Sequence, residues 1–353
     1  MQLAGQAVWV IFAALAGSVA ARAAEGLGPA PGTGGMGASP TSALPVQDLS
    51  SDLLISGTKK VDYGNAKVPS LGGIPLLALW MRQGMDTYYY GIHPQLKIEV
   101  GLKVLPLHLA NPEMVRRWCS EAKMAARVIS PHFVKLKDAG EECGLFYMVM
   151  EFVNGPTAGS HLKKVKDSGA PGLTEAEALD TCIAASEGLA ALHKEGIINR
   201  DIKPAKILIP KVQGRQDLDF KAAKLFDLGY AHDEVRGDSG TLGKGLLGTP
   251  AFMAPEQAMD VKNAHKPADV FSIGATLYAL LSGQPPFKGQ TALQVLAATQ
   301  KDPHTPLCSV RPDVSSATAA LVDRCLAKDP AARYADGPAL LAALKECRAA
   351  LGH

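Results

Sequence analysis

A few charged side chains of this 353-residue chain stand where they could handle phosphate groups. Asp201 follows Arg200 in segment 196–209, GIINRDIKPAKILI, and Lys203 comes two residues later. An aspartate beside a lysine can orient a hydroxyl group, accept its proton and neutralise a moving phosphate. Asp227 lies between an apolar strand and a glycine in KLFDLGYA, which suits a carboxylate that binds a metal ion. Either segment alone is equally typical of a surface turn.

A second candidate pair lies earlier in the chain. Lys103 stands in the middle of an apolar strand, VGLKVLP, where a lysine either extends to solvent or is paired. Glu121 lies on the edge of an apolar helical stripe, one turn from Trp118. Because a helix that follows a strand can bring a glutamate to a strand lysine, we expect this pair to hold an ammonium group over phosphates. Two unrelated surface charges are the alternative.

The elements that must position these side chains begin with a β-rich region. Its predicted strands are 73–81, 87–92, 98–106, 133–140 and 145–153. One helix interrupts them, with Asn111 as N-cap, Pro112 at the first position and an apolar stripe that runs to Ile129.

A helical region follows from residue 174. Thr174 and Glu177 form a capping box for a helix that stops at Gly196. Residues 268–282 are nearly all apolar and predict a buried helix ended by Gly283. Amphipathic helices are expected in TALQVLAAT and PALLAALKECRAAL. A β-rich lobe before a helical lobe predicts an α+β fold with a ligand cleft at the seam.

Composition limits the partners. The net charge is +2, from 36 basic and 34 acidic residues, so no general affinity for nucleic acid or an anionic membrane is indicated. Residues 3–21 are an apolar run followed by Ala21-Arg22-Ala23, which resembles a signal-peptidase site. The placement of Arg22 after the run also fits a membrane anchor with the globular part in the cytoplasm. Export, anchoring and a mis-assigned start codon remain alternatives.

Taken in order, the motifs resemble the eukaryotic-type Ser/Thr protein kinase family, and bacterial receptor-like members most. The resemblance covers roughly residues 73–350 and rests on VGLK, Glu121, NRDIKP, DLG at 227–229, GTPAFMAPE at 248–256, DVFSIG at 269–274 and CLAKDPAARYAD. It implies a bilobal protein-kinase-like fold. The expected parts are a signal-like or anchor segment (1–24), a Gly/Pro/Ala-rich linker (25–50), an N-terminal extension (51–72), an N-lobe (73–153) and a C-lobe (154–351).

The resemblance also implies roles toward ATP and Mg²⁺ or Mn²⁺. Lys103 would hold the α- and β-phosphates while paired with Glu121, and Asp227 would bind the metal ion. Asp201 would be the base and Lys203 its phosphate partner. The last of the implied catalytic residues is Thr249, which would brace Asp201 and Lys203.

Further implied residues shape the adenine pocket and the C-lobe. Met150 would line the back of the pocket, and the backbones of Glu151 and Val153 would bond the adenine edge. Among the structural residues, Glu256 would pair with Arg333, and Asp269 would fix the catalytic-loop backbone.

The chain departs from the family pattern in its glycine loop. The three glycine positions fall on Met81, Gln83 and Asp86, and only Gly84 remains between them. Side chains thus stand where backbone N–H groups should approach phosphates, and Asp86 adds a negative charge near the triphosphate.

The catalytic loop departs at two positions. Asn199 replaces the usual histidine, at modest expected cost, because asparagine can also hydrogen-bond. Lys206 replaces the asparagine that binds the second metal ion, and a charged lysine has no lone pair to donate. Either Lys206 swings away and one ion serves, or its ammonium replaces the second metal as counter-charge.

Two functions from different classes therefore stand. The first is an ATP-dependent Ser/Thr protein kinase that transfers the γ-phosphoryl group to protein hydroxyls with weakened activity. The second is a pseudokinase that acts as a signalling or binding module. A small-molecule kinase fits less well, because GTPAFMAPE resembles the segment that docks a peptide substrate.

Overall fold

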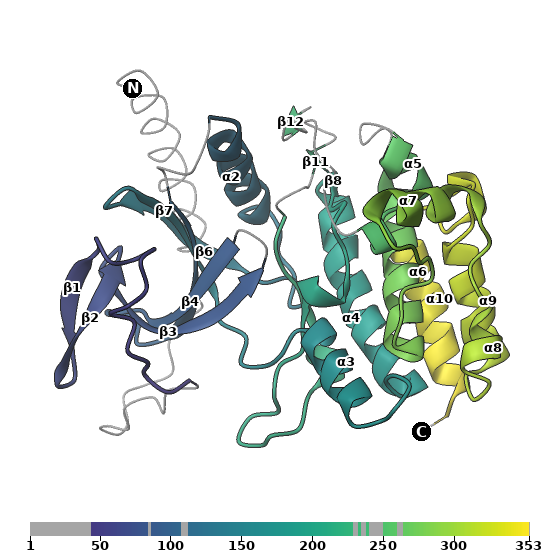
Figure 1. The fold of residues 1–353 in the computed structure, drawn as a ribbon, viewed down its shortest axis with the longest axis horizontal. Coiled ribbons are helices and arrows are strands. Elements are labelled where there is room, and N and C mark those ends of the chain that lie inside the picture. Colours follow the sequence, from purple (N-terminus) through teal and green to yellow (C-terminus); the bar gives the residue numbers. More distant parts are fainter. Residues whose placement is uncertain are drawn as a thin grey trace, which may run out of the picture. The chain divides into compact units, whose positions relative to one another are not determined.

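The computed structural model describes residues 44–83, 86–106, 112–228, 232–233, 238–239, 250–259 and 264–352. They fall into two compact units (Figure 1). The β-rich unit comprises the chain up to Ala126 together with Lys135–Phe152, and the helical unit comprises Arg127–Val134 and the chain from Val153. The predicted α+β, two-lobed fold class is confirmed.

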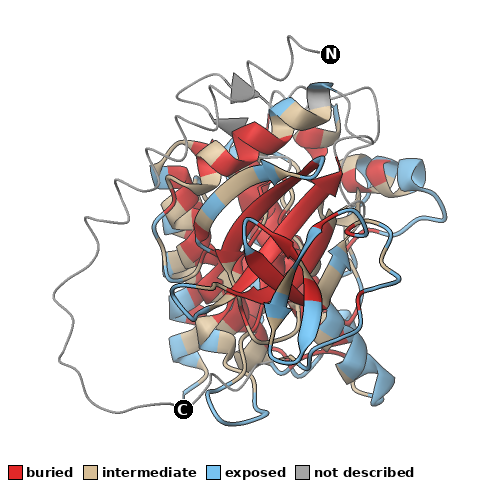
Figure 2. Cartoon of the chain, turned by 90° about the vertical axis from the view of Figure 1, so that its left-hand side faces the viewer, coloured by how far each residue is buried: buried red, intermediate tan, exposed pale blue. Residues whose placement is uncertain are grey.

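The β-rich unit is built on one antiparallel sheet of seven strands, in the order β1-β2-β3-β4-β5-β7-β6. The strands are β1 (Lys59–Tyr63), β2 (Ala66–Leu71), β3 (Ile74–Gln83), β4 (Asp86–Ile92), β5 (Glu99–Pro106), β6 (Leu136–Glu142) and β7 (Leu145–Glu151). Strands β3, β4, β5 and β7 are largely buried, as Figure 2 shows in red. Their buried residues, most of them apolar or aromatic, form the core of this unit.

The hairpin β1–β2 was not predicted. It lies within residues 51–72, which the sequence suggested only as an extension, and it extends the sheet through pairing of Ser70 and Leu71 with β3. The sequence of β1, KKVDY, carries charges and has no fully buried position, so it lacks the apolar alternation that marks a strand.

Helix α2 (Pro112–Ala125) belongs to the β-rich unit and buries Trp118, Cys119 and Ala122, as the apolar stripe predicted. The prediction that the stripe reaches Ile129 is wrong, because the helix ends at Ala125 and Ile129 is 86% exposed. Pro131 disfavours helical backbone only at Ser130, so it does not explain why the helix ends as early as Ala125. Asn111 lies outside the described residues.

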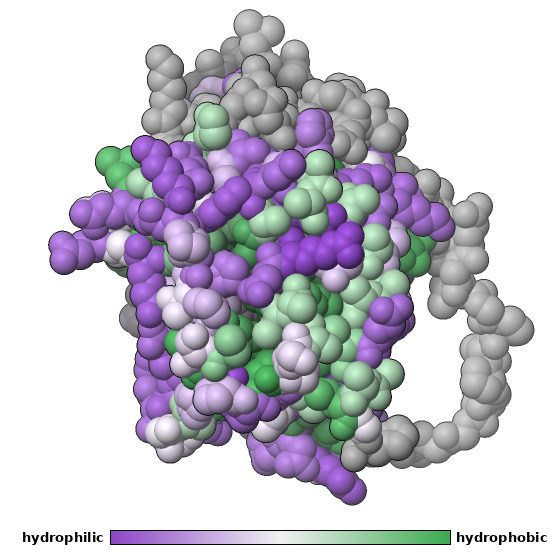
Figure 3. All heavy atoms as spheres, turned by 90° about the vertical axis from the view of Figure 1, so that its right-hand side faces the viewer, coloured by the Kyte–Doolittle hydropathy of each residue, from purple (hydrophilic) through white to green (hydrophobic). Residues whose placement is uncertain are grey.

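The helical unit contains α3 (Ala158–Asp167), α4 (Glu175–Lys194), α5 (Pro255–Met259), α6 (Lys266–Ser282), α7 (Ala292–Lys301), α8 (Leu307–Val310), α9 (Ser316–Cys325) and α10 (Gly337–Ala350). Its short strands are β8 (Ile197–Ile198), β9 (Ile207–Leu208), β10 (Lys224–Leu225), β11 (His232–Asp233) and β12 (Asp238–Ser239). Helix α6 packs against α4 and α9, and α10 packs against α4. The face drawn in Figure 3 is mixed, with hydrophilic side chains beside an apolar area near its middle.

The start predicted at Thr174 and the stop predicted at Gly283 are confirmed, whereas α6 begins at Lys266 and not at residue 268. The capping box of Thr174 and Glu177 is present at the start of α4. Helix α6 is buried from Ala268 to Leu281, and it ends at Gly283 in the left-handed conformation, with φ of 71°. The catalytic-loop segment follows α4 along the chain and is hydrogen-bonded to α6.

Within the described ranges, no helix combines the length and the apolar character needed to cross a membrane. The predicted signal or anchor segment, residues 3–21, lies outside those ranges.

Candidate active site

Lys103 is held by carboxylates inside the β-rich unit. Its side chain is 2% exposed, and its Nζ donates to both oxygens of Glu121, at 2.8 and 2.9 Å. The ion pair predicted from strand-then-helix order is therefore present. A second carboxylate, that of Asp86, lies 3.4 Å from the same ammonium group. A phosphate that binds Lys103 would have to compete with Asp86, the residue at the third glycine position.

The catalytic-loop segment of the helical unit carries the second predicted pair. Lys203 Nζ donates to both oxygens of Asp201, at 2.8 and 3.1 Å. The backbone N–H of Asp201 donates to Asn199 Oδ1 at 3.0 Å. Asn199 is 3% exposed, so it acts as the buried hydrogen-bonding post that was predicted for the altered position.

Asp269, in the first turn of α6, holds the backbone of this loop by hydrogen bonds. Its carboxylate accepts the backbone N–H groups of Asn199 (2.9 Å) and Arg200 (2.8 Å), in agreement with the prediction. It also bonds His193 Nε2 at 2.9 Å, and His193 Nδ1 accepts the backbone N–H of Gly337 at 3.0 Å. Because Nδ1 is the acceptor in this contact, Nε2 is the N–H that donates the hydrogen bond to Asp269. The imidazole thus links α4, α6 and α10.

Sequence reasoning missed two members of this network. His193 lies near the end of α4, and a single histidine in a helix gives no signal of a partner 76 residues away. Gln257 is 4% exposed, and its Nε2 donates to the carbonyl of Arg200 at 2.7 Å. Arg200 itself adopts the left-handed conformation, with φ of 67°. These contacts show that the loop conformation is held at several points.

Lys206 lies on the carboxylate of Asp227. Its Nζ donates to Asp227 Oδ2, and the two side chains are only 10% and 4% exposed. Asp227 takes a left-handed φ of 71°, which is uncommon for a residue other than glycine. Lys206 therefore does not swing away; it lies on the carboxylate that was predicted to bind the metal ion.

Asp201, Asp227, Lys203 and Lys206 form an acid–base cluster whose formal charges cancel. Burial raises the pKa of Asp201 above its ordinary value, and the negative charge of Asp227 acts in the same direction. The positive charges of Lys203 and Lys206 oppose this shift without cancelling it.

A divalent cation does not fit Asp227 as the cluster stands. One carboxylate oxygen already accepts an ammonium group, and Lys206 can offer no lone pair of its own. A dication ~4–5 Å from this ammonium would be repelled by roughly 6–8 kcal/mol at an effective dielectric constant of ~20. Among the described residues, no group of three or more His, Cys, Asp or Glu side chains could hold a metal ion. The ammonium group of Lys206 thus places positive charge beside Asp227, where the family resemblance predicts a metal cation.

The residues predicted to shape the adenine site fall on strands β3 and β7 and in the segment that follows β7. Met150 is 8% exposed on β7, where it pairs with Gly101 of β5. The backbone N–H of Glu151 is bonded to the carbonyl of Lys135 at 2.9 Å. Val153 is buried and belongs to the helical unit. Met81 lies on β3, half-buried. Gly84 and Thr249 lie outside the described residues.

The structural tie predicted for the helical unit is present. Arg333 donates through two nitrogens to the two oxygens of Glu256, at 2.7 and 2.9 Å. The guanidinium group is fully buried and also donates to the carbonyls of Pro267, Ala327 and Lys328. A planar guanidinium suits this forked geometry better than an ammonium group would.

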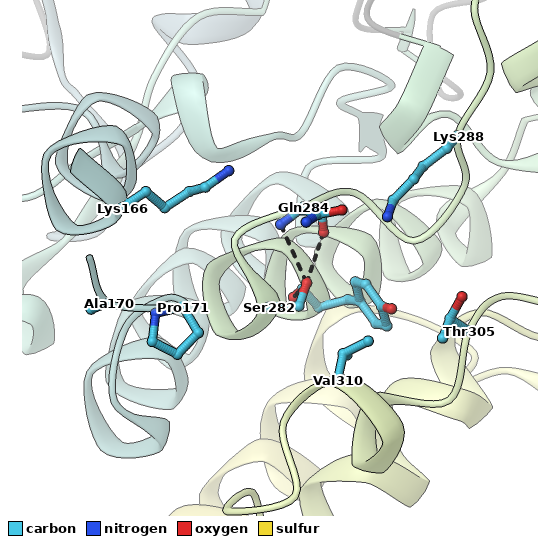
Figure 4. Close-up of a pocket in the computed structure, with 9 residues that line it drawn as sticks. Lys166, Ala170, Pro171, Ser282, Gln284, Lys288, Thr305 and Val310 are labelled. Carbon is cyan, nitrogen blue, oxygen red and sulfur yellow. Dashed lines mark hydrogen bonds between the residues drawn. The ribbon is translucent and has the colours of Figure 1, made fainter. Parts of the chain in front are cut away.

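A cavity of about 410 Å³ lies elsewhere in the helical unit (Figure 4). Its lining includes Lys166 of α3, Tyr278 and Ser282 of α6, and Lys288. None of the predicted site residues lines it, and Lys166 Nζ is bonded to the carbonyl of Gly283 at 2.7 Å. The cavity is therefore separate from the acid–base cluster.

Comparison with known proteins agrees with this geometry. A family model described as the protein kinase domain matches residues 86–345. The chain is similar to the serine/threonine-protein kinase Pkn1 of Myxococcus xanthus, with 31% identity over 78% of this chain and 38% of the relative. It is also similar to PknA of Mycobacterium tuberculosis (32% identity, 75% of this chain, 59% of the relative) and PknB of Mycolicibacterium smegmatis (32% identity, 71% and 39%).

The chain spans less than two thirds of the length of these curated relatives. The kinase-domain match, by contrast, extends from β4 through most of α10 and includes Lys103, Glu121, Asp201, Asp227 and Asp269. On the match over residues 86–345, the chain belongs to the protein kinase family.

Proposed function

We propose that the chain is an ATP-dependent Ser/Thr protein kinase that transfers the γ-phosphoryl group to protein hydroxyls with weakened activity. The observation that carries this proposal is the intact Asp201–Lys203 pair on a loop whose backbone Asp269 holds. Because buried hydrogen bonds fix the loop, the proton acceptor is already in place and the loop need not rearrange before the reaction. Phosphoryl transfer depends mainly on such positioning.

Each charged group has a role in this proposal. Asp201 would accept the proton of the substrate hydroxyl as its oxygen bonds to the γ-phosphorus and the bond to the β-phosphate oxygen breaks, leaving ADP. Lys203 would neutralise the transferred group, and Lys103 would bind the α- and β-phosphates. Membership of the family carries a general expectation of a divalent cation. In this chain Lys206 would supply positive charge instead, since the cation does not fit beside it.

The same contacts explain why the activity should be weak. The ammonium of Lys103 is already shared between Glu121 and Asp86, and the negative charge of Asp86 opposes a triphosphate. The metal-binding carboxylate of the family is bound to Lys206. A nucleotide would therefore have to replace internal partners that the protein already provides.

These internal partners also favour the alternative, a pseudokinase that acts as a signalling or binding module. A self-neutralised cluster can maintain the fold without any ligand. The two proposals differ in one measurement, which is whether the purified protein transfers phosphate from ATP to a Ser/Thr substrate. Membrane association through residues 3–21 is a separate proposal. It is tested by fractionating cells that express the full chain and measuring whether the protein is found with the membranes.

Replacing Asp201 by Asn is expected to reduce phosphotransfer by about 100-fold or more, because the substrate hydroxyl loses its proton acceptor. The measurement is transfer of labelled phosphate from ATP to a generic Ser/Thr protein substrate, with Mg²⁺, Mn²⁺ and EDTA compared. Asp217→Asn is the matched control, since Asp217 is exposed in the same unit, and it should retain wild-type activity.

Two results would contradict the enzyme proposal. Equal transfer by Asp201→Asn and the wild type would indicate a contaminating kinase. No transfer by the folded wild type under any of the three conditions would favour the module.

Phosphotransfer is expected to fall at mildly acidic pH. Asp201 must be ionised to accept a proton, and burial raises its pKa above the ordinary aspartate value. The activity should therefore be present above this raised pKa and decrease as the pH falls through it, at a higher pH than the ordinary value of about 4 would give. A pH profile of kcat/KM, with folding monitored at each pH, checks this. Constant activity down to pH of about 4 in folded protein would contradict it.

A further inference from the structure

Strand β5 carries Gly101 on the same face as Lys103, because residues two apart in a strand share a face. Gly101 pairs directly with Tyr90 of β4 on one side and Met150 of β7 on the other. In the proposed function Lys103 binds phosphates, and Met150 with Glu151 marks the base end. A nucleotide base held between those ends would lie against the bare backbone of Gly101.

That place is already filled by the indole of Trp80. Trp80 lies on β3 at an irregularity in the β3–β4 pairing between Leu79 and Met81. A Cβ atom added to Gly101 would lie 2.9 Å from Cε3 of Trp80 and closer still to Cζ3. The indole therefore rests on the backbone of Gly101 in space that a side chain at this position would need. Met150 borders the same space, because its Cγ would lie 3.3 Å from the added atom.

Aromatic neighbours keep the indole there. The ring of Phe152 lies 4.9 Å from that of Trp80, and the ring of Tyr88 meets it edge-on at 6.3 Å. Tyr90 in turn packs against Phe152 at 4.7 Å. Tyr88 is fully buried, with Lys103 Nζ 5.9 Å from its ring centre. All of these residues belong to the β-rich unit.

We propose that Trp80 occupies the nucleotide-base position on Gly101 and so limits how tightly this chain binds adenine nucleotides. The inference rests on the proposed function in that a nucleotide is taken to bind against β5. An indole is a flat bicyclic ring of about the size of adenine, and each needs the same flat surface. The base can bind only in the fraction of molecules in which Trp80 has rotated away, and the apparent affinity is reduced by that fraction.

The test is the replacement Trp80→Leu, with binding of ATP, adenosine and inorganic triphosphate measured by calorimetry in EDTA. If Trp80 is rotated away from Gly101 in about one tenth or less of the wild-type molecules, the substitution should raise the affinity for ATP and adenosine by about 10-fold or more. Affinity for triphosphate should not change, because that probe has no base. Trp118→Leu is the matched control: it removes an indole from the same unit that packs against Phe146, away from Gly101, and should not tighten adenosine binding.

The outcomes separate this inference from the proposed function. Unchanged or weaker ATP and adenosine binding by a folded Trp80→Leu protein would overturn the inference, whereas phosphotransfer by the wild type would still support the kinase. Tighter adenosine binding without phosphotransfer in any variant would support the inference and contradict the kinase. If Trp80→Leu does not fold, Trp80→Phe carries the same test, with an intermediate gain expected and no gain overturning the inference.

Discussion

Replacing Lys206 by Asn is expected to make nucleotide binding depend on a divalent cation and to raise phosphotransfer by about 10-fold or more. In the wild type, the Lys206 ammonium neutralises Asp227 and repels a dication. The substitution removes the positive charge and introduces an amide oxygen, which is a suitable ligand for Mg²⁺. ATP binding by the wild type should therefore be the same in Mg²⁺ and in EDTA, whereas that of Lys206→Asn should require Mg²⁺ or Mn²⁺.

The same substitution should change stability in a way that reports on the cation directly. Asp227 has a 4% exposed side chain, and the substitution removes the ammonium group that neutralises this buried carboxylate. Breaking a buried ion pair typically costs about 3–5 kcal/mol. Thermal unfolding should show Lys206→Asn destabilised in EDTA and restabilised by Mg²⁺ or Mn²⁺. The wild type should not respond.

The control for this experiment is the double variant Lys206→Asn/Asp227→Asn. It lacks the carboxylate, so its thermal unfolding should be insensitive to metal ions. A wild-type protein whose ATP binding is abolished by EDTA would show that Lys206 does not stand in for a cation. Lower phosphotransfer by Lys206→Asn in Mg²⁺ would contradict the predicted gain.

Replacing Asp269 by Ala is expected to reduce the free energy of unfolding by about 3–5 kcal/mol. Asp269 is fully buried and accepts hydrogen bonds from His193 and from the backbones of Asn199 and Arg200. Its removal leaves three buried donors without their acceptor, and each unsatisfied buried donor is costly. Because two of these donors hold the loop that carries Asp201, any phosphotransfer should also be lost.

A second His–Asp contact in the helical unit provides the control. His304 Nε2 lies 2.8 Å from Asp323 Oδ1, but the Asp323 side chain is 56% exposed. Water can replace the lost contact there, so Asp323→Ala should change the free energy of unfolding by about 1 kcal/mol or less. Denaturant unfolding of both variants measures the difference. If Asp269→Ala costs no more than Asp323→Ala, the proposed anchoring role of Asp269 is wrong.

Much of the fold followed from local pattern. The capping box at Thr174, the left-handed stop at Gly283 and the apolar run of α6 are signals that a few neighbouring residues carry, and the structure has them. The hairpin β1–β2 was missed because its strands carry charges and one of them has no fully buried position. Its stability comes from pairing with β3, which is not visible in its own sequence.

The candidate site was predictable where one element constrains the next. A helix that follows a strand packs close to it, so a strand lysine and a helical glutamate can come into contact. Lys103 and Glu121 are paired in this way. The Glu256–Arg333 pair and the Asp269 contacts followed only from the family resemblance, since 77 and 70 residues separate those partners. The third donor to Asp269, His193, was not predicted at all.

The sequence by itself determined the order of motifs, the two-lobed α+β fold and which charged residues were candidates for phosphate chemistry. Only the tertiary structure decided which side chains meet: Lys206 binds Asp227, Asp86 lies beside Lys103, and Trp80 covers Gly101. The physical reason is range. Helix and strand periodicity are set by neighbours along the chain, whereas a contact between side chains on separate strands or loops depends on sheet register and backbone placement to within a few ångströms.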